Sequence, residues 1–179
     1  MKRLILICTA LLAWPAWAQE DAMKDLPGYV DFGQLSAVFG EPSVQIAVGQ
    51  SLLNMVGALS ANEDPESAEL LKRLKGVRIH VFEHSEMSAG AIDYVNDASG
   101  KLTAMGWESV VMVNSDDEQM RVFMKINNDM IEGITVMAVE EDEAAFINVI
   151  GNISPAELER VMDNFNVDFD GDDVANDAG

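Results

Sequence analysis

The sequence predicts an α+β fold, a mainly antiparallel sheet of about six strands with helices packed on one face. Three observations favour this class. Six segments alternate apolar and polar residues with the period of a strand, while other segments repeat apolar residues at the spacing of a helix. The last four strand segments follow one another through short polar or acidic connectors. Strands joined by hairpins are antiparallel neighbours, which leaves the helices to cover one face of the sheet.

The first half of the predicted domain alternates strands with helices. Residues 43–48 alternate with period two and predict the first strand, and residues 52–59 have the spacing of a helix. A second helix begins at Asp64 and Pro65, a capping residue followed by proline at the first helical position, and ends at Gly76. Because helices join the first two strands, these strands could be parallel to each other.

The second strand, residues 77–82, has one aliphatic face and one mixed face. A third helix is expected at residues 89–105, and Ser154 and Glu157 form a capping box that starts a last helix. Between these helices lies the predicted meander of four strands, at residues 108–113, 120–126, 131–139 and 145–151.

The first eighteen residues predict a secretory signal peptide. Lys2 and Arg3 precede an apolar run that ends in small residues at Ala18. We expect cleavage after Ala18 and export to the periplasm. The apolar run is shorter than the ~18 residues that span a bilayer, so no transmembrane segment is expected in the mature chain. Cys8, the only cysteine, leaves with this leader.

The chain is strongly acidic, with a formal net charge of −20 that becomes −22 when the two leader cations are removed. Such a polyanion repels nucleic acid phosphates and anionic lipids, so neither is an expected partner. We expect one domain at residues 29–165, after a flexible lead-in at residues 19–28 and before a disordered acidic tail at residues 166–179. No cofactor is expected.

Five short stretches carry a family resemblance: YVDF at residues 29–32, EPSVQI at 41–46, LLKRLKGVR at 70–78, GWE at 106–108 and VIGNI at 149–153. In this order they resemble the bacterial family called domain of unknown function 4252, over residues 30–158. The resemblance implies a small exported protein. Members of this family have no established catalytic residues, so no functional residue is carried over to this chain.

Two parts of the chain are candidates for cation binding. His80 and His84 lie near glutamates, but four residues of extended strand span ~13 Å, too far for two ligands of one zinc ion. No metal site is therefore expected. The run from Asn166 to Asp177 has the oxygen spacing of a calcium loop, although asparagine begins it and aspartate replaces the usual final glutamate. A weakly calcium-binding envelope module remains an alternative to a solvated acidic tail.

No catalytic residue is expected. The mature chain has no cysteine nucleophile, no Gly-x-Ser-x-Gly elbow and no glycine-rich phosphate loop. Its acids are so numerous that paired carboxylates carry no specificity. The chain is therefore more consistent with a non-enzymatic domain, and the alternative is a hydrolase or isomerase that uses carboxylates and His80 in a pocket. Methionines alternate in residues 120–126 and are expected to fill the buried face rather than bind copper.

The few cations are the most informative feature. If the aliphatic strand faces point to the helices, the mixed faces form one open surface. That surface would be basic and aromatic, with the side chains of Arg78, His80, Phe82, Arg121, Phe123 and Lys125. It suits an acidic partner, either an envelope protein or an anionic small ligand. The alternatives are that these residues neutralise neighbouring carboxylates or lie beneath a second layer. The sequence thus predicts an exported interaction or ligand-binding domain, with envelope signalling as one role.

Overall fold

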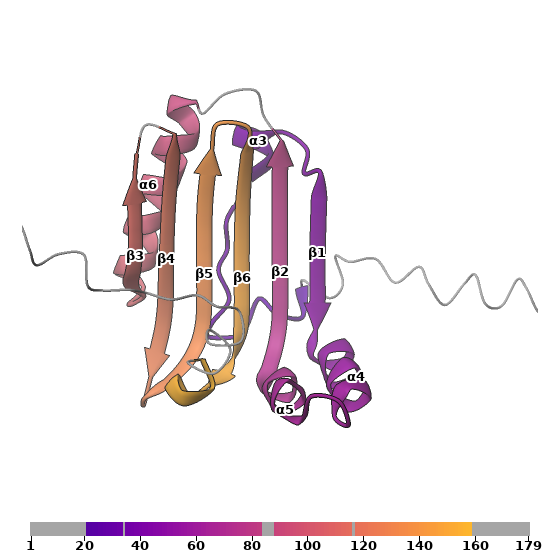
Figure 1. Ribbon diagram of the computed structural model, residues 1–179. Coiled ribbons are helices and arrows are strands. Elements are labelled where there is room, and N and C mark those ends of the chain that lie inside the picture. Colours follow the sequence, from indigo (N-terminus) through magenta and orange to yellow (C-terminus); the bar gives the residue numbers. More distant parts are fainter. Residues whose placement is uncertain (1–20, 34, 84–87, 116, 159–179) are drawn as a thin grey trace, which may run out of the picture.

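The computed structural model describes residues 21–33, 35–83, 88–115 and 117–158. These residues form one six-stranded sheet in the order β1-β2-β6-β5-β4-β3 (Figure 1). Its strands are β1 (Val44–Gly49), β2 (Leu74–Glu83), β3 (Glu108–Asn114), β4 (Glu118–Asn127), β5 (Met130–Glu140) and β6 (Glu143–Ile153). The helices are α3 (Leu35–Phe39), α4 (Gln50–Ser60), α5 (Pro65–Arg73) and α6 (Ala89–Ala104), and a helical turn follows at residues 155–158. The predicted α+β class is confirmed.

Parts of the predictions concern residues outside these ranges. The leader at residues 1–18, the acidic tail at residues 166–179 and His84 all lie outside the described residues. Within the described ranges, no helix is both long and apolar enough to cross a membrane.

All neighbouring strands are antiparallel, including β1 and β2. The suggestion that the first two strands could be parallel is therefore wrong. The reason is that two helices, rather than one, join them. A Cβ atom on Gly57 of α4 would lie 3.0 Å from the carbonyl oxygen of Ala68 in α5, so the two helices pack closely. This helical pair returns the chain to the end of β1, where Gly49 lies opposite Gly76.

One face of the sheet is covered by α3, α6 and residues 28–33, which lie behind the strands in Figure 1. Phe82 and Phe146 of the sheet meet the ring of Phe39 in α3 at centroid distances of 5.5 and 5.0 Å. Val95 and Leu102 of α6 belong to the same buried cluster. This aromatic layer is the main core of the domain.

Residues 21–28 were expected to be a flexible lead-in, but the structure packs them against the sheet. Met23 is 2% exposed, and its sulfur lies over Gly76, where a Cβ atom would overlap it. A Cβ atom on Gly133 would lie 2.7 Å from the Cα atom of Gly28, so the two backbones touch. Hydropathy patterns do not reveal such contacts, because the contacts depend on glycines that lie far from this segment in the sequence.

The helices α4 and α5 stand at one end of the sheet (Figure 1). Asp64 accepts a hydrogen bond from the Ser67 backbone N–H at 3.0 Å, and Pro65 is the first helical residue, which confirms the predicted start of α5. The helix ends earlier than predicted, because Leu74 already begins β2. Leu53 of α4 joins Leu74 in a second, smaller core cluster.

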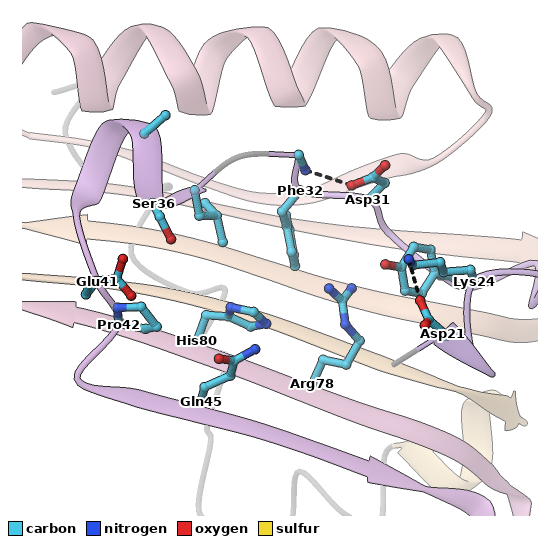
Figure 2. A pocket seen from close by; sticks show the side chains of 14 residues that line it. Asp21, Lys24, Asp31, Phe32, Ser36, Glu41, Pro42, Gln45, Arg78 and His80 are labelled. Carbon is cyan, nitrogen blue, oxygen red and sulfur yellow. Dashed lines mark hydrogen bonds and ion pairs between the residues drawn. The ribbon is translucent and has the colours of Figure 1, made fainter. Parts of the chain in front are cut away.

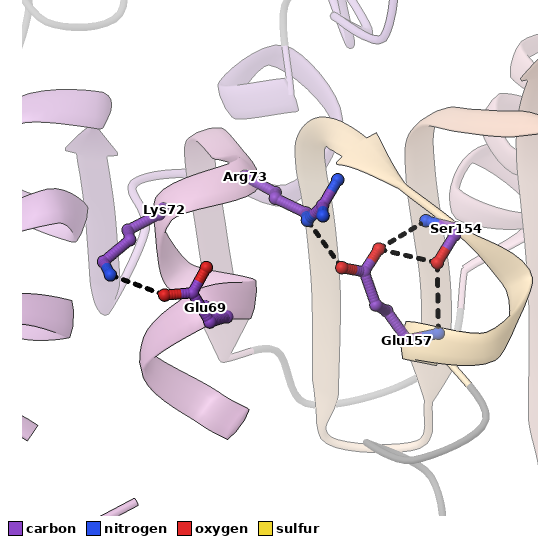
Figure 3. Close-up of polar contacts among 5 residues, drawn as sticks. All are labelled: Glu69, Lys72, Arg73, Ser154 and Glu157. Carbon is purple, nitrogen blue, oxygen red and sulfur yellow. Dashed lines mark hydrogen bonds and ion pairs between the residues drawn. The ribbon is translucent and has the colours of Figure 1, made fainter. Parts of the chain in front are cut away.

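The predicted capping box after β6 is also present (Figure 3). The Glu157 carboxylate accepts a hydrogen bond from the Ser154 backbone N–H at 2.8 Å, and the Ser154 hydroxyl accepts one from the Glu157 N–H at 3.4 Å. Glu157 also forms an ion pair with Arg73 at 2.5 Å. This contact joins the helical turn to α5.

Candidate functional site

The residues predicted to form an open basic surface lie mainly on the covered face of the sheet. Phe82 is 0% exposed, Phe123 1%, Arg78 3% and Arg121 4%. The expectation that the mixed face is open is therefore wrong, and the alternative in which these residues lie beneath a second layer describes them. The physical reason is that the large rings fill the space under α3 and α6, while each buried arginine finds backbone oxygen atoms.

Arg78 holds the N-terminal segment onto the sheet. Its Nη1 atom donates a hydrogen bond to the Val30 carbonyl at 2.7 Å, and its guanidinium lies 4.5 Å from the centre of the Tyr29 ring. Asn148 in the neighbouring strand is also fully buried, accepts a hydrogen bond from the Val30 N–H at 3.0 Å and donates one to the Gly28 carbonyl at 2.9 Å. These side chains satisfy a backbone segment that belongs to neither helix nor sheet.

Arg121 has an equally structural environment at the β3 side. Its Nη1 atom donates to the Val113 carbonyl at 2.7 Å, and its Nη2 atom donates to the Asn114 Oδ1 atom at 2.6 Å. Burial lowers the pKa of Arg121 from the usual arginine value. The strands β6 and β5 lie between Arg78 and Arg121, so the structure does not bring the two predicted cations together.

Lys125, like His80, is only half-buried, whereas the other four predicted site residues are buried. Its Nζ atom donates hydrogen bonds to the carbonyls of Met105 at 2.5 Å and Gly106 at 3.4 Å, just beyond the end of α6. A cation at this place stabilises the negative end of the helix dipole. Lys125 is thus a helix-capping residue in the structure.

A cavity of about 610 Å³ lies between the N-terminal segment, α3 and the first two strands, and its wall includes Arg78 and His80 (Figure 2). Carboxylates share this wall, at Asp21, Asp31 and Glu41. Lys24 is paired with Asp21 at 2.6 Å. Because its cations are balanced by nearby acids, the cavity suits an anionic ligand less well than the predicted open surface would have.

A second cavity, of about 690 Å³, separates the N-terminal segment from α6. Tyr94 lines it and donates a hydrogen bond from its hydroxyl to the Phe32 carbonyl. Burial raises the pKa of Tyr94, so this phenol remains a donor at physiological pH. In the part of the chain that the structure describes, His, Asp and Glu side chains form no group of three that could hold a metal ion.

The opposite face of the sheet carries the apolar strand residues that were expected to point to the helices and form the core. Two adjacent rows cross all the strands, each with one residue per strand and only apolar side chains. We call this surface the open apolar face. One row is Val44, Val81, Ala145, Ala138, Met120 and Val113, and the other is Ile46, Ile79, Ile147, Val136, Val122 and Val111.

The open apolar face is turned toward the reader in Figure 1, and no described segment crosses its two rows. Ile46 is 40% exposed at the edge, and the inner residues of the rows are half-buried. Half-burial is expected for such residues even without a covering layer, because neighbours surround each side chain within the sheet. The methionine side chains of residues 120–126, expected to fill the buried core, point to this face.

Helices close this side of the sheet only at one end. The next row contains Val77, Val149 and Ile134, which pack against the second core cluster together with Leu70 and Leu158 of the helical end. On α4, a stripe of apolar residues at helical spacing also points outward, namely Leu52, Met55, Val56 and Leu59. Exposed apolar side chains therefore also lie on α4, beyond the end of β1. Alternating apolar residues in each strand were the sequence signal for the open apolar face.

Comparisons with known proteins agree with the resemblance seen in the sequence. The model of a family described as a domain of unknown function (DUF4252) matches residues 40–161. The matched segment contains every strand of the sheet and the rows of the open apolar face. No curated protein and no solved structure matches the chain.

Proposed function

We propose that this chain, which belongs to the DUF4252 family, is an exported, non-enzymatic interaction domain that binds its partner through the open apolar face. The observation that supports this function is the pair of uninterrupted apolar rows on an otherwise polyanionic chain. An apolar surface gains roughly 25 cal/mol for each Å² removed from water, and it needs no ion pairs to do so. The predicted leader supports the periplasm as its location, where envelope signalling is one role.

The charge of the chain adds selectivity to this surface. A net charge of −20 repels other polyanions at long range, while the open apolar face attracts at contact. Exposed contiguous apolar patches mark interaction sites on soluble proteins. Arg78 and Arg121 are not part of this proposed surface, because both are buried and bonded to backbone oxygen atoms.

A matched pair of variants tests this function. Ile46 lies on the open apolar face at 40% exposure, and Val38 lies on α3, on the opposite side, at 39% exposure. We expect Ile46→Lys to abolish capture of the physiological partner from envelope extract, and Val38→Lys to leave it unchanged. A partner that both variants retain equally would contradict the proposed surface. Thermal unfolding of each variant controls for folding.

The cavity around His80 favours a second candidate, a hydrolase or isomerase. His80 shares the wall with Asp31 and Glu41, which provides a histidine and carboxylates in one hollow (Figure 2). Under this candidate, His80→Gln fails to restore the phenotype of a deletion strain although the protein folds. Under the interaction function, the same variant restores it fully, while Ile46→Lys does not.

A further inference from the structure

β1 is the less protected of the two edges of the sheet. In the described part of the chain, β1 and β3 each have a neighbouring strand on one side only. Proteins commonly protect such edges with charged side chains, prolines or bulges. β3 begins with Glu108 and has a bulge at Val110, where its register with β4 shifts. β1 contains no charged residue and no proline, and its register with β2 is continuous from Val44 to Gly49.

One hydrogen bond shows which backbone groups of β1 point outward. The Ser43 backbone N–H donates to the Val81 carbonyl at 2.8 Å, so this carbonyl points to β1. Val81 lies opposite Val44, and successive residues of an antiparallel strand point their backbone groups alternately to one side and the other. The N–H and C=O groups of Gln45 and Ala47 therefore point away from β2. No backbone group of the described residues bonds them from that side.

We propose that an extended segment of a partner protein pairs with β1 as a seventh, antiparallel strand of the sheet. In this binding mode main-chain hydrogen bonds provide affinity, and alternate side chains provide specificity. The orientation follows from the sheet itself, because all its pairs are antiparallel and such pairs are slightly more stable per residue than parallel ones. This inference rests on the proposed function, because the new strand would continue the rows of the open apolar face beyond Val44 and Ile46.

The two sides of β1 define the side chains of the added segment. Val44 and Ile46 are 42% and 40% exposed on the open apolar face, so we expect apolar residues beside them. Gln45 points to the other side, where it lines the cavity together with His80, so polar residues are expected there (Figure 2). The six residues of β1 limit the pairing to a segment of similar length, because Pro42 precedes the strand and α4 follows it directly.

Charges at the two ends of β1 indicate which end of the segment is basic. Exposed acids lie where β1 begins, since Glu41 precedes the strand, and Glu83 and Glu143 lie opposite each other in β2 and β6. Where β1 ends, α4 contains no charged residue, and Lys75 lies in the adjacent part of β2. An antiparallel segment places its C-terminal end beside the acids. The partner segment therefore alternates apolar and polar residues and is followed by lysine or arginine.

Binding of a labelled synthetic peptide, VTVTVKK, to the purified full chain tests this partner chemistry. We expect saturable binding by fluorescence anisotropy, with a dissociation constant at least about tenfold higher for VTVTVEE and for KKVTVTV. In the proposed pairing the threonine amides face β1 and the inner valine amides face solvent. Methyl groups on the threonine amides should therefore abolish binding, whereas a methyl group on an inner valine amide should not. Absence of saturable binding, equal binding of the three peptides, or binding that tolerates methylated threonine amides would overturn the inference.

Two variants separate this inference from the proposed function. Ala47→Pro removes an outward N–H of β1 and leaves the two rows unchanged, whereas Ile46→Lys changes the open apolar face itself. We expect Ala47→Pro to lose both VTVTVKK and the physiological partner, while its thermal unfolding stays close to that of the wild type. A folded Ala47→Pro that retains the partner, together with loss in Ile46→Lys, would overturn strand addition and leave the proposed function standing. Retention by both variants would refute both.

Amide hydrogen exchange, measured by NMR on the unmodified chain, gives a readout that needs no variant. We expect saturating VTVTVKK to slow exchange at Gln45 and Ala47, and to leave the Ile46 amide, which points to β2, unchanged. Protection that spares Gln45 and Ala47 would overturn the proposed pairing. Protection of these two amides by concentration alone, with formation of a dimer, would identify a second copy as the occupant and overturn the basic partner segment.

Discussion

The covered face of this sheet contains more polar side chains than the open apolar face, although burial usually favours apolar residues. The covered face contains arginines, an asparagine and a threonine among its phenylalanines, whereas the half-exposed face contains aliphatic residues and methionine. Burial therefore does not follow hydropathy along these strands. The covered face must satisfy an irregular N-terminal segment as well as α6, and polar side chains are the means of doing so.

The comparison also separates two kinds of interaction. On the covered face, Arg78 and Asn148 form directional hydrogen bonds to particular backbone atoms of residues 28–30. On the open apolar face, every contact is non-directional, so many partners of suitable shape can bind there. The first face determines the fold, and the second is available for association.

The largest expected effect is on the free energy of unfolding. It is seen by comparing substitutions at two adjacent residues that point to opposite faces of the sheet. Phe146 is 0% exposed beneath the helices, while Ile147 lies in the middle of the open apolar face. We expect Phe146→Ala to lower the free energy of unfolding by about 4 kcal/mol, because it leaves a cavity in the aromatic core. Ile147→Ala should cost only about 1 kcal/mol in the monomer, since its side chain loses less buried area.

Chemical denaturation of both variants, at concentrations where the chain is monomeric, measures this contrast. Equal losses of several kcal/mol would mean that a further layer covers the open apolar face within one chain.

The next effect concerns the polar anchors of the covered face. We expect Asn148→Ala to lower the free energy of unfolding by about 3 kcal/mol, because the Val30 N–H and the Gly28 carbonyl lose their partner in a buried place. Hydrogen exchange at Val30 should accelerate together with this loss. Asn152→Ala, at an exposed position of the same strand, is the control and should change neither quantity.

These anchors show where sequence reasoning succeeds and where it stops. Local signals were sufficient for the strand segments, for the cap at Asp64 and for the box at Ser154 and Glu157, because each depends on neighbours in the chain. Alternation distinguishes two faces of a strand, but it does not say which one a helix will cover. The deciding contacts, such as Val30 to Asn148, join residues more than a hundred positions apart.

The smallest effect concerns the helical end that closes the open apolar face. Hydrogen bonds from the Ser67 side chain and backbone N–H lower the pKa of Asp64 below its ordinary value of 3.8. A lowered pKa in the folded state stabilises the fold above pH 3.8 and ceases to do so as the pH falls through the folded value. The difference in melting temperature between the wild type and Asp64→Asn should therefore shrink in acid. A difference that stays constant from neutral pH to strongly acidic pH would contradict this role.

Methionine oxidation tests the central claim, that the open apolar face is accessible in one chain, on the unmodified protein. Peroxide oxidises accessible methionines. Met120 lies on the open apolar face, Met137 is 0% exposed beneath the helices, and Met105 is 55% exposed just after the end of α6. We predict that peroxide oxidises Met120 in dilute solution, as it does the exposed Met105, while the buried Met137 stays protected. A Met120 that is as unreactive as Met137 at every dilution would contradict the account.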